Sequence, residues 1–189
     1  MIWRWHVMNA RNVALALLAA LALAGCTSDH DQLMARADKS ARYQMATAHV
    51  DAVSCVEEAL NAGAPLTANG LPASVAACFN MSTFGISDAK LRADGHGVPG
   101  GSSLRSVGRD QGDADSRRIV VIDAASSSLQ KLYSDVTVSY GQCWSSTIDL
   151  RAGTMTTPER EECSADLLWL INGRGDQLDE FLTVAPEKP

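Results

Sequence analysis

Four cysteines are the residues of this 189-residue chain whose type and spacing point most directly to chemistry: Cys55, Cys78, Cys143 and Cys163. Such residues either bind zinc or form disulfides. Structural zinc sites use closely spaced cysteine pairs. Here 22 residues lie between the first two cysteines and 19 between the last two, and there is no C-x-x-C, so we expect no metal. An even number of cysteines in an exported protein favours two disulfides, for which three pairings exist.

Histidines and serines show no catalytic pattern. A nucleophilic serine needs a base and an orienting acid, and it often lies in G-x-S-x-G, which Gly101-Ser102-Ser103 does not match. His49 falls at the margin of a helical stripe, where we expect it to be partly exposed. His96 lies among glycines in Gly95–Gly101 and is the histidine with the most site-like setting. We therefore predict no catalytic site and no cofactor, and we keep His96 as a possible binding residue.

Two tryptophans lie close to the second pair of cysteines, at Trp144 and Trp169. Tryptophan often anchors protein–protein interfaces, but it also packs protein cores. Both alternatives stay open for these two residues, and we keep them as possible binding residues.

The N-terminus has the features of an export signal. Arg4 and Arg11 precede Val13–Gly25, an apolar run of 13 residues. A membrane-spanning helix needs about 20 such residues. The run ends in Leu23-Ala24-Gly25-Cys26, which resembles the lipobox of bacterial prolipoproteins. The resemblance covers residues 1–26 and implies a signal peptide at 1–25, cleavage before Cys26 and attachment of fatty acyl chains to that cysteine.

This resemblance also implies a location. Many diderm bacteria keep a lipoprotein in the inner membrane when an aspartate follows the lipid-bearing cysteine, and this chain has Thr27 there. We expect an anchor in the outer membrane, facing the periplasm. Removing two arginines with the signal peptide changes the charge to (16 − 2) − 22 = −8. An acidic domain without a basic stripe argues against nucleic-acid binding.

The mature domain, residues 26–189, begins with a helical pattern. Small and apolar residues recur at spacings of three and four from Met34 to Ala59, between a cap at Ser28 or Asp29 and a stop at Asn61–Gly63. A second helix is expected near Leu71–Met81. In an antiparallel hairpin of these helices Cys55 and Cys78 lie opposite each other, which predicts their disulfide.

The second half is ambiguous. Residues 82–117 hold seven of the 14 glycines and suggest a flexible linker. Ile119–Ile122 and Val136–Tyr140 are typical of strands, but helical spacing continues from Ile122 to Cys143, and we favour a helix. Thr157-Pro158 predicts a further helix, and Leu178–Leu182 a short last one. A weak repeat of the first hairpin predicts the pairing Cys143–Cys163.

These patterns predict a mainly α fold of two disulfide-bonded helical hairpins joined by a glycine-rich linker. The alternative is an α+β fold with strands near 118–123 and 136–144. The expected function is that of an envelope-anchored, non-enzymatic protein-binding module, of inhibitor or immunity type, with an envelope or exported protein as partner. The alternatives are a small cell-wall or lipid hydrolase acting through His96 and a structural component of envelope assembly.

Overall fold

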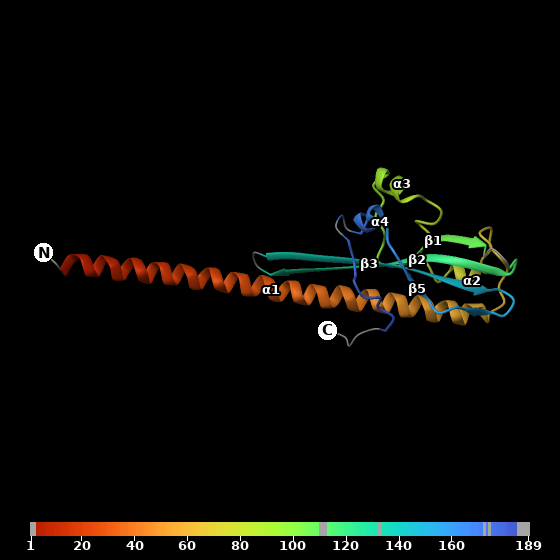
Figure 1. Cartoon of the computed structure of the whole chain (residues 1–189), viewed down its shortest axis with the longest axis horizontal. Helices are drawn as coiled ribbons and strands as arrows, with labels where there is room; N and C mark the ends of the chain where they lie inside the picture. The colour runs from red at the N-terminus through yellow and green to blue at the C-terminus, as the bar shows by residue number, and fades with distance from the viewer. Residues whose placement is uncertain (1–2, 110–112, 132–133, 172, 174, 185–189) are drawn as a thin grey trace.

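A single long helix runs the length of the molecule. The computed structural model describes residues 3–109, 113–131, 134–171, 173 and 175–184, with side chains from Asp29 onward. Helix α1 (Trp3–Leu60) extends beyond the sheet at its N-terminal end, while its C-terminal half packs along one face of the sheet (Figure 1). The side chain of Cys26 lies outside the described residues. Within the described part of the chain, no helix is long and apolar enough to span a membrane.

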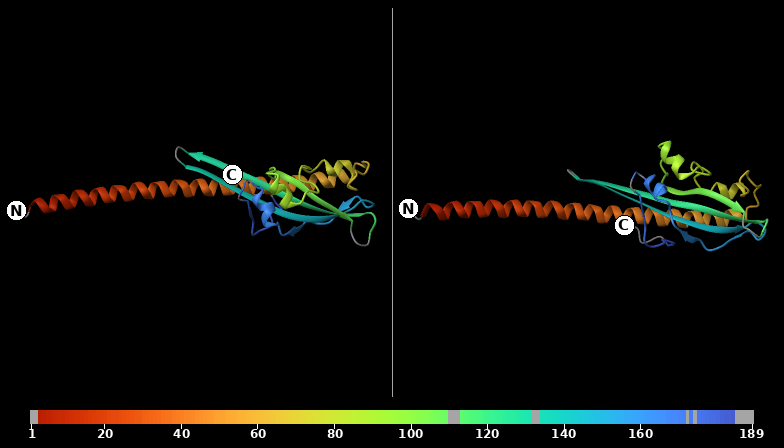
Figure 2. Two further views of the ribbon diagram at one scale, coloured as in Figure 1. Left: turned by 90° about the horizontal axis from the view of Figure 1, so that it is seen from above. Right: turned by 45° about the horizontal axis from the view of Figure 1, so that its top comes forward.

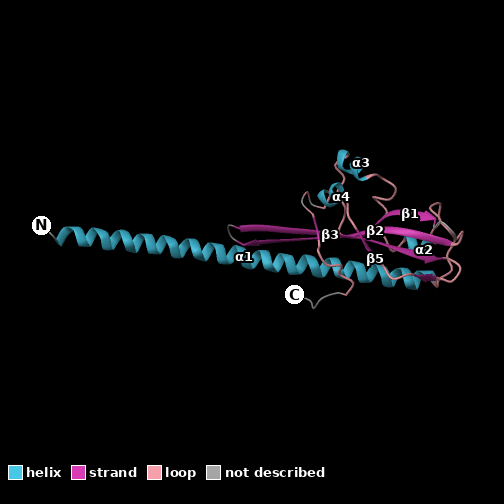
Figure 3. Ribbon diagram, viewed as in Figure 1, coloured by secondary structure: helices cyan, strands magenta, loops and turns pink. Residues whose placement is uncertain are grey.

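The sheet is built on a long antiparallel hairpin. Strands β2 (Ser116–Lys131) and β3 (Ser134–Asp149) have 16 residues each and pair along their whole length. Strand β1 (Gly101–Arg109) pairs antiparallel with the first part of β2. Three short strands pair with β3: β4 (Thr154–Met155) and β5 (Glu159–Glu161) antiparallel, and β6 (Asp176–Gln177) parallel. The result is a mixed sheet of six strands (Figure 3).

The mainly α prediction is therefore wrong, and the described residues of the segment Ile122–Cys143, for which a helix was favoured, are strand. The alternative strands near 118–123 and 136–144 lie within β2 and β3, which are both longer than expected. The reason is burial on both faces. Val121 and Trp144 pack toward α1, whereas Ile122 and Cys143 pack on the opposite face. Two-sided burial removes the alternation of apolar and polar residues that normally reveals a strand.

The glycine-rich segment is not a linker between two hairpins. Residues 82–117 contain helix α3 (Asp88–Ala93) and strand β1. Leu91 and Leu104, from this segment, are 1% and 0% exposed and belong to two different core clusters. The segment thus supplies an edge strand of the sheet and part of the layer that covers its second face (Figure 2).

The helical predictions differ in outcome. Helix α1 ends at Leu60, as predicted, and its buried residues include Ala37, Ala41, Met45, Ala52 and Val56. It does not begin at the expected cap at residues 28–29, because the apolar run on the N-terminal side of that cap is also helical. Helix α2 (Ala73–Ala76) is shorter than the predicted one. Thr157-Pro158 leads into β5, and helix α4 (Ala165–Trp169) starts only after the Ser164 cap. Residues 178–182 form no helix.

Both disulfide pairings are confirmed. Cys55 of α1 is bonded to Cys78 just after α2, close to the geometry that predicted it. Cys143 is bonded to Cys163, but it joins β3 to the turn before α4, not two helices. The second pairing was therefore right although the hairpin repeat behind it was wrong.

Candidate functional site

A buried carboxylate organises the interface between α1 and the sheet. Asp123 of β2 is 0% exposed and accepts four hydrogen bonds. Its Oδ2 accepts from His49 Nδ1 at 2.9 Å, Trp144 Nε1 at 2.8 Å and Gln142 Nε2 at 3.1 Å, and its Oδ1 accepts from Ser102 Oγ at 2.6 Å. These donors come from α1, β3 and β1. The carboxylate thus joins three elements around one point.

This cluster contains the residue types of a serine hydrolase, but its hydrogen bonds are arranged differently. In a catalytic triad the histidine lies between the serine and the acid. Here Ser102 bonds to Asp123 itself and also to the carbonyl oxygen of Ala48, at 3.0 Å. His49 is 2% exposed and is enclosed edge-on by Trp144 and Phe181, each ring centroid 5.1 Å away. The geometry suits a structural connection between layers.

A second candidate is the part of the hairpin that extends past the rest of the sheet. We define the distal hairpin as residues 126–131 of β2 and 134–139 of β3. Strand β1 pairs with β2 only up to Ala124, and β6 pairs with β3 only at Tyr140 and Gly141. The distal strands pair only with each other in the described part of the chain. Their outer backbone edges are therefore open.

The distal hairpin lies along the first part of α1 for which side chains are described. Its apolar face contacts the helix through a small core cluster made of Leu33, Ala37, Leu129, Val136 and Val138. Its tip is held by two polar contacts. Lys131 Nζ pairs with Asp29 Oδ2 at 2.9 Å, and His30 Nδ1 lies 3.2 Å from Ser134 Oγ. The tip is thus held by helix residues three and four positions beyond Cys26.

A groove runs beside the outer edge of β3. This β3 groove has a volume of about 410 Å³. Its lining comes from Met34, Ala35 and Asp38 of α1, from residues 137–140 of β3, and from Asp176 of β6. Met34 is 42% exposed, so part of an apolar side chain is accessible in the groove. The groove combines an apolar floor, two carboxylates and an open strand edge.

A tyrosine closes one end of the groove. Tyr140 donates its hydroxyl hydrogen bond to Asp38, and the guanidinium of Arg42 lies 5.2 Å from its ring centroid. Burial raises the pKa of Tyr140 above its ordinary value, and the hydrogen bond and charge of Asp38 raise it further. Arg42 also pairs with Asp38 and with Glu180. The carboxylate of Asp38 is therefore already partnered.

A larger cleft lies on the opposite face of the sheet, with a volume of about 490 Å³. Its cation is Arg105, whose side chain is only 10% exposed. That guanidinium donates to the carbonyl oxygens of Thr83 and Ile86 and pairs with Asp88. Because these partners already use its charge and donors, Arg105 holds the surrounding loop together. The remaining charged lining is acidic, from Glu161 and Glu162.

The structure separates the residues singled out in the sequence. Trp144 is completely buried on the α1 side of the sheet, so it is not available to a partner. Trp169 is 45% exposed on α4, on the other face, with Arg92 stacked 4.6 Å above its ring centroid. His96 is exposed after α3. Among the described residues, no three histidine, cysteine, aspartate or glutamate side chains are grouped to hold a metal ion.

Sequence reasoning missed the features that now stand out. His49 was expected near the surface, and Asp123 was expected on the polar side of a helix, whereas both are buried. The one available signal was an aspartate inside the apolar run Ile119–Ala125, since a charged residue there needs buried partners. No family model, no curated protein and no solved structure matches this chain.

Proposed function

We propose that this protein is a lipid-anchored, non-enzymatic binding module of the bacterial cell envelope, whose partner is another envelope or exported protein. The observation that carries the binding role is the distal hairpin. Open strand edges are sites where proteins pair with other chains, and soluble proteins normally cover or shorten them. Here 12 residues form such edges next to a groove.

The anchoring part of the proposal rests on the lipobox-like residues ending at Cys26 and on Thr27 after it. The two disulfides support export, since such bonds persist in oxidising compartments outside the cytosol. With Cys26 acylated, the hairpin tip beside Asp29 and His30 is the part of the domain nearest the outer membrane. A partner bound there lies close to the periplasmic surface of that membrane.

Crosslinking in intact cells with an amine-reactive reagent, followed by mass spectrometry, tests the binding role. We expect one dominant envelope protein to be captured by the native chain and lost with Cys26→Ala, which has no anchor. Thr27→Asp is the matched variant: it keeps the lipid but moves the protein to inner-membrane fractions on a density gradient. Absence of any captured partner above background would contradict the binding role, and a Cys26→Ala protein still in the membrane fraction would contradict the anchor.

A further inference from the structure

The outer edge of β3 over residues 134–139 offers unpaired backbone groups. In an antiparallel pair, alternate residues direct both N–H and C=O toward the neighbouring strand, and the residues between them direct both outward. Three of these six residues therefore present a donor and an acceptor on the side away from β2. Within the described residues, no backbone hydrogen bond from another segment reaches this edge.

The protein itself already uses the next part of this edge. Strand β6 pairs in parallel with Tyr140 and Gly141. The part of the β3 edge next to residues 134–139 therefore already carries an added strand. The β3 groove lies directly beside the unused part, and its lining includes Val138, Met34 and Ala35. These features favour the β3 edge over the β2 edge as a docking site.

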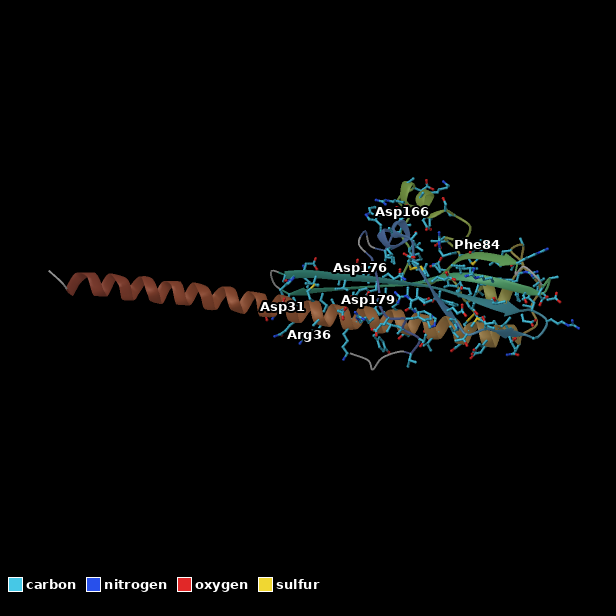
Figure 4. All side chains as sticks on the ribbon, viewed as in Figure 1. Asp31, Arg36, Phe84, Asp166, Asp176 and Asp179 are labelled. Carbon is cyan, nitrogen blue, oxygen red and sulfur yellow. A yellow bond between two sulfur atoms is a disulfide. The ribbon has the colours of Figure 1, made fainter. Side chains whose placement is uncertain are left out.

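Charge indicates what would bind. Asp176 lines the groove, is exposed, and has no hydrogen-bond or ion-pair partner among the described residues (Figure 4). Asp38 also lines the groove, but its charge is already paired with Arg42. A second copy of this chain would bring Asp176 against another acidic groove, because the mature domain is strongly acidic. A segment that carries a cation is complementary to the groove. Because only alternate side chains of an added strand share a face, its apolar side chains and its cation must come from alternate positions to reach the same groove.

We infer that an extended segment of the partner, with apolar side chains and a cationic side chain at alternate positions on one face, adds as a strand to the outer edge of β3 over residues 134–139. Its backbone pairs with the three outward-facing residues. Its apolar side chains fill the β3 groove against Met34 and Val138, and a lysine or arginine pairs with Asp176. This inference rests on the proposed function and specifies the partner's binding segment.

The direct test uses the purified full chain in neutral detergent. The probe is a blocked hexapeptide with lysine, valine and lysine at positions 1, 3 and 5 and serine at the other positions, and its control has glutamate in place of lysine. Amide hydrogen exchange is followed by NMR. With the lysine peptide at about ten times its Kd, we expect alternate amides within residues 134–139 to exchange about tenfold more slowly. Protection of residues 126–131 instead, no protection at all, or equal binding of both peptides would overturn the inference.

Charge reversal provides the second arm. We expect Asp176→Lys to weaken binding of the lysine peptide about three- to tenfold, from loss of an exposed ion pair and added repulsion. Asp51→Lys is the matched control. Asp51 is exposed on α1, 13 residues beyond Asp38, or roughly 20 Å along the helix, and its substitution should leave the affinity unchanged. Equal effects of both variants would contradict a role for the groove.

Photo-crosslinking in cells separates failure of this inference from failure of the proposed function. The photoreactive residue replaces either Thr137 on β3 or Ser128, its paired residue on β2. Both substitutions remove the same 2.8 Å hydrogen bond between these side chains, so their structural cost is matched. We expect capture of a basic, extended segment from Thr137 only. If amine crosslinking captures a partner and the Thr137 probe does not, the binding role stands and the β3 edge is wrong.

Discussion

His49 of α1 and Asp123 of β2 are hydrogen-bonded in the interior, with 2.9 Å between Nδ1 and Oδ2, although 74 positions separate them in the sequence. Both side chains are buried. Breaking a buried polar pair costs more than such a pair contributes net, because the remaining partner is left unsatisfied. The contact therefore makes the attachment of α1 to the sheet sensitive to substitution of either residue.

We expect the two partners to differ in their sensitivity. Asp123→Leu removes the buried acceptor of His49 and Trp144, whereas Ser102 and Gln142 keep carbonyl acceptors at Ala48 and Leu182, and it should lower the free energy of unfolding by about 4 kcal/mol. His49→Leu leaves Asp123 with its other three donors and should cost about 2 kcal/mol. Urea unfolding under oxidising conditions measures both. The double variant should cost less than the sum of the two. Additive losses, or a greater loss from His49→Leu, would contradict this account.

Tyr140 should make stability decline in alkali. Burial and its bond to Asp38 raise its pKa above the ordinary 10.0. As the pH rises above about 10, the unfolded chain therefore loses the hydroxyl proton of Tyr140 before the folded chain does. The free energy of unfolding falls over this pH range, and below a pH of about 10 the contribution of Tyr140 to stability is fully present.

Tyr140→Phe is the variant that isolates this effect. It should be about 1 kcal/mol less stable than the native chain near pH 7, where it lacks the hydrogen bond to Asp38. We expect the difference to shrink as pH rises above about 10, since only the native chain loses the stabilisation. Denaturant unfolding at several pH values measures the difference. A difference that stays constant with pH would show that Tyr140 does not titrate differently in the two states.

Gly175 is required where the chain enters β6. A Cβ atom built there would lie 2.5 Å from the carbonyl oxygen of Leu168 and 2.7 Å from Cβ of Ile171. Backbone would have to move, so Gly175→Ala should cost about 1–3 kcal/mol and displace β6 from β3. Gly108→Ala is the control, because nothing lies within 4 Å of its Cβ position. Thermal unfolding compares the two; equal melting temperatures would contradict the predicted clash.

The two disulfides should contribute separately to stability. They close segments with sequence separations of 23 and 20. Chain-entropy arguments give about 3 kcal/mol for each loop. Replacing both cysteines of one pair with alanine should lower the free energy of unfolding by about that amount. The pairs belong to opposite faces of the sheet, so their losses should add. A reductant should lower the free energy of unfolding of the native chain and should not change that of a variant that lacks both disulfides. No effect of the reductant on the native chain would contradict this prediction.

Local patterns predicted the elements that depend on near neighbours. The stripe from Ala37 to Val56 and the stop after Leu60 predicted the described end of α1, because a helix satisfies its hydrogen bonds within four residues. The pairing Cys55–Cys78 followed from the same local geometry. The segment from Ile122 to Cys143 failed, because its apolar residues fit both a helix and a two-sided strand, and only contacts with distant layers distinguish the two.

By itself the sequence determined the C-terminal boundary of α1, the pair Cys55–Cys78, an acidic net charge and the lipobox-like residues on which the proposed anchor rests. Tertiary structure alone decided that residues 116–149 form a hairpin, that Trp144 is a core residue and that His49 meets Asp123. It also decided that β3 runs past its neighbours and has an edge beside α1 that no other described strand covers. The physical reason is that strand pairing and burial depend on residues far away in the chain, which no local pattern records.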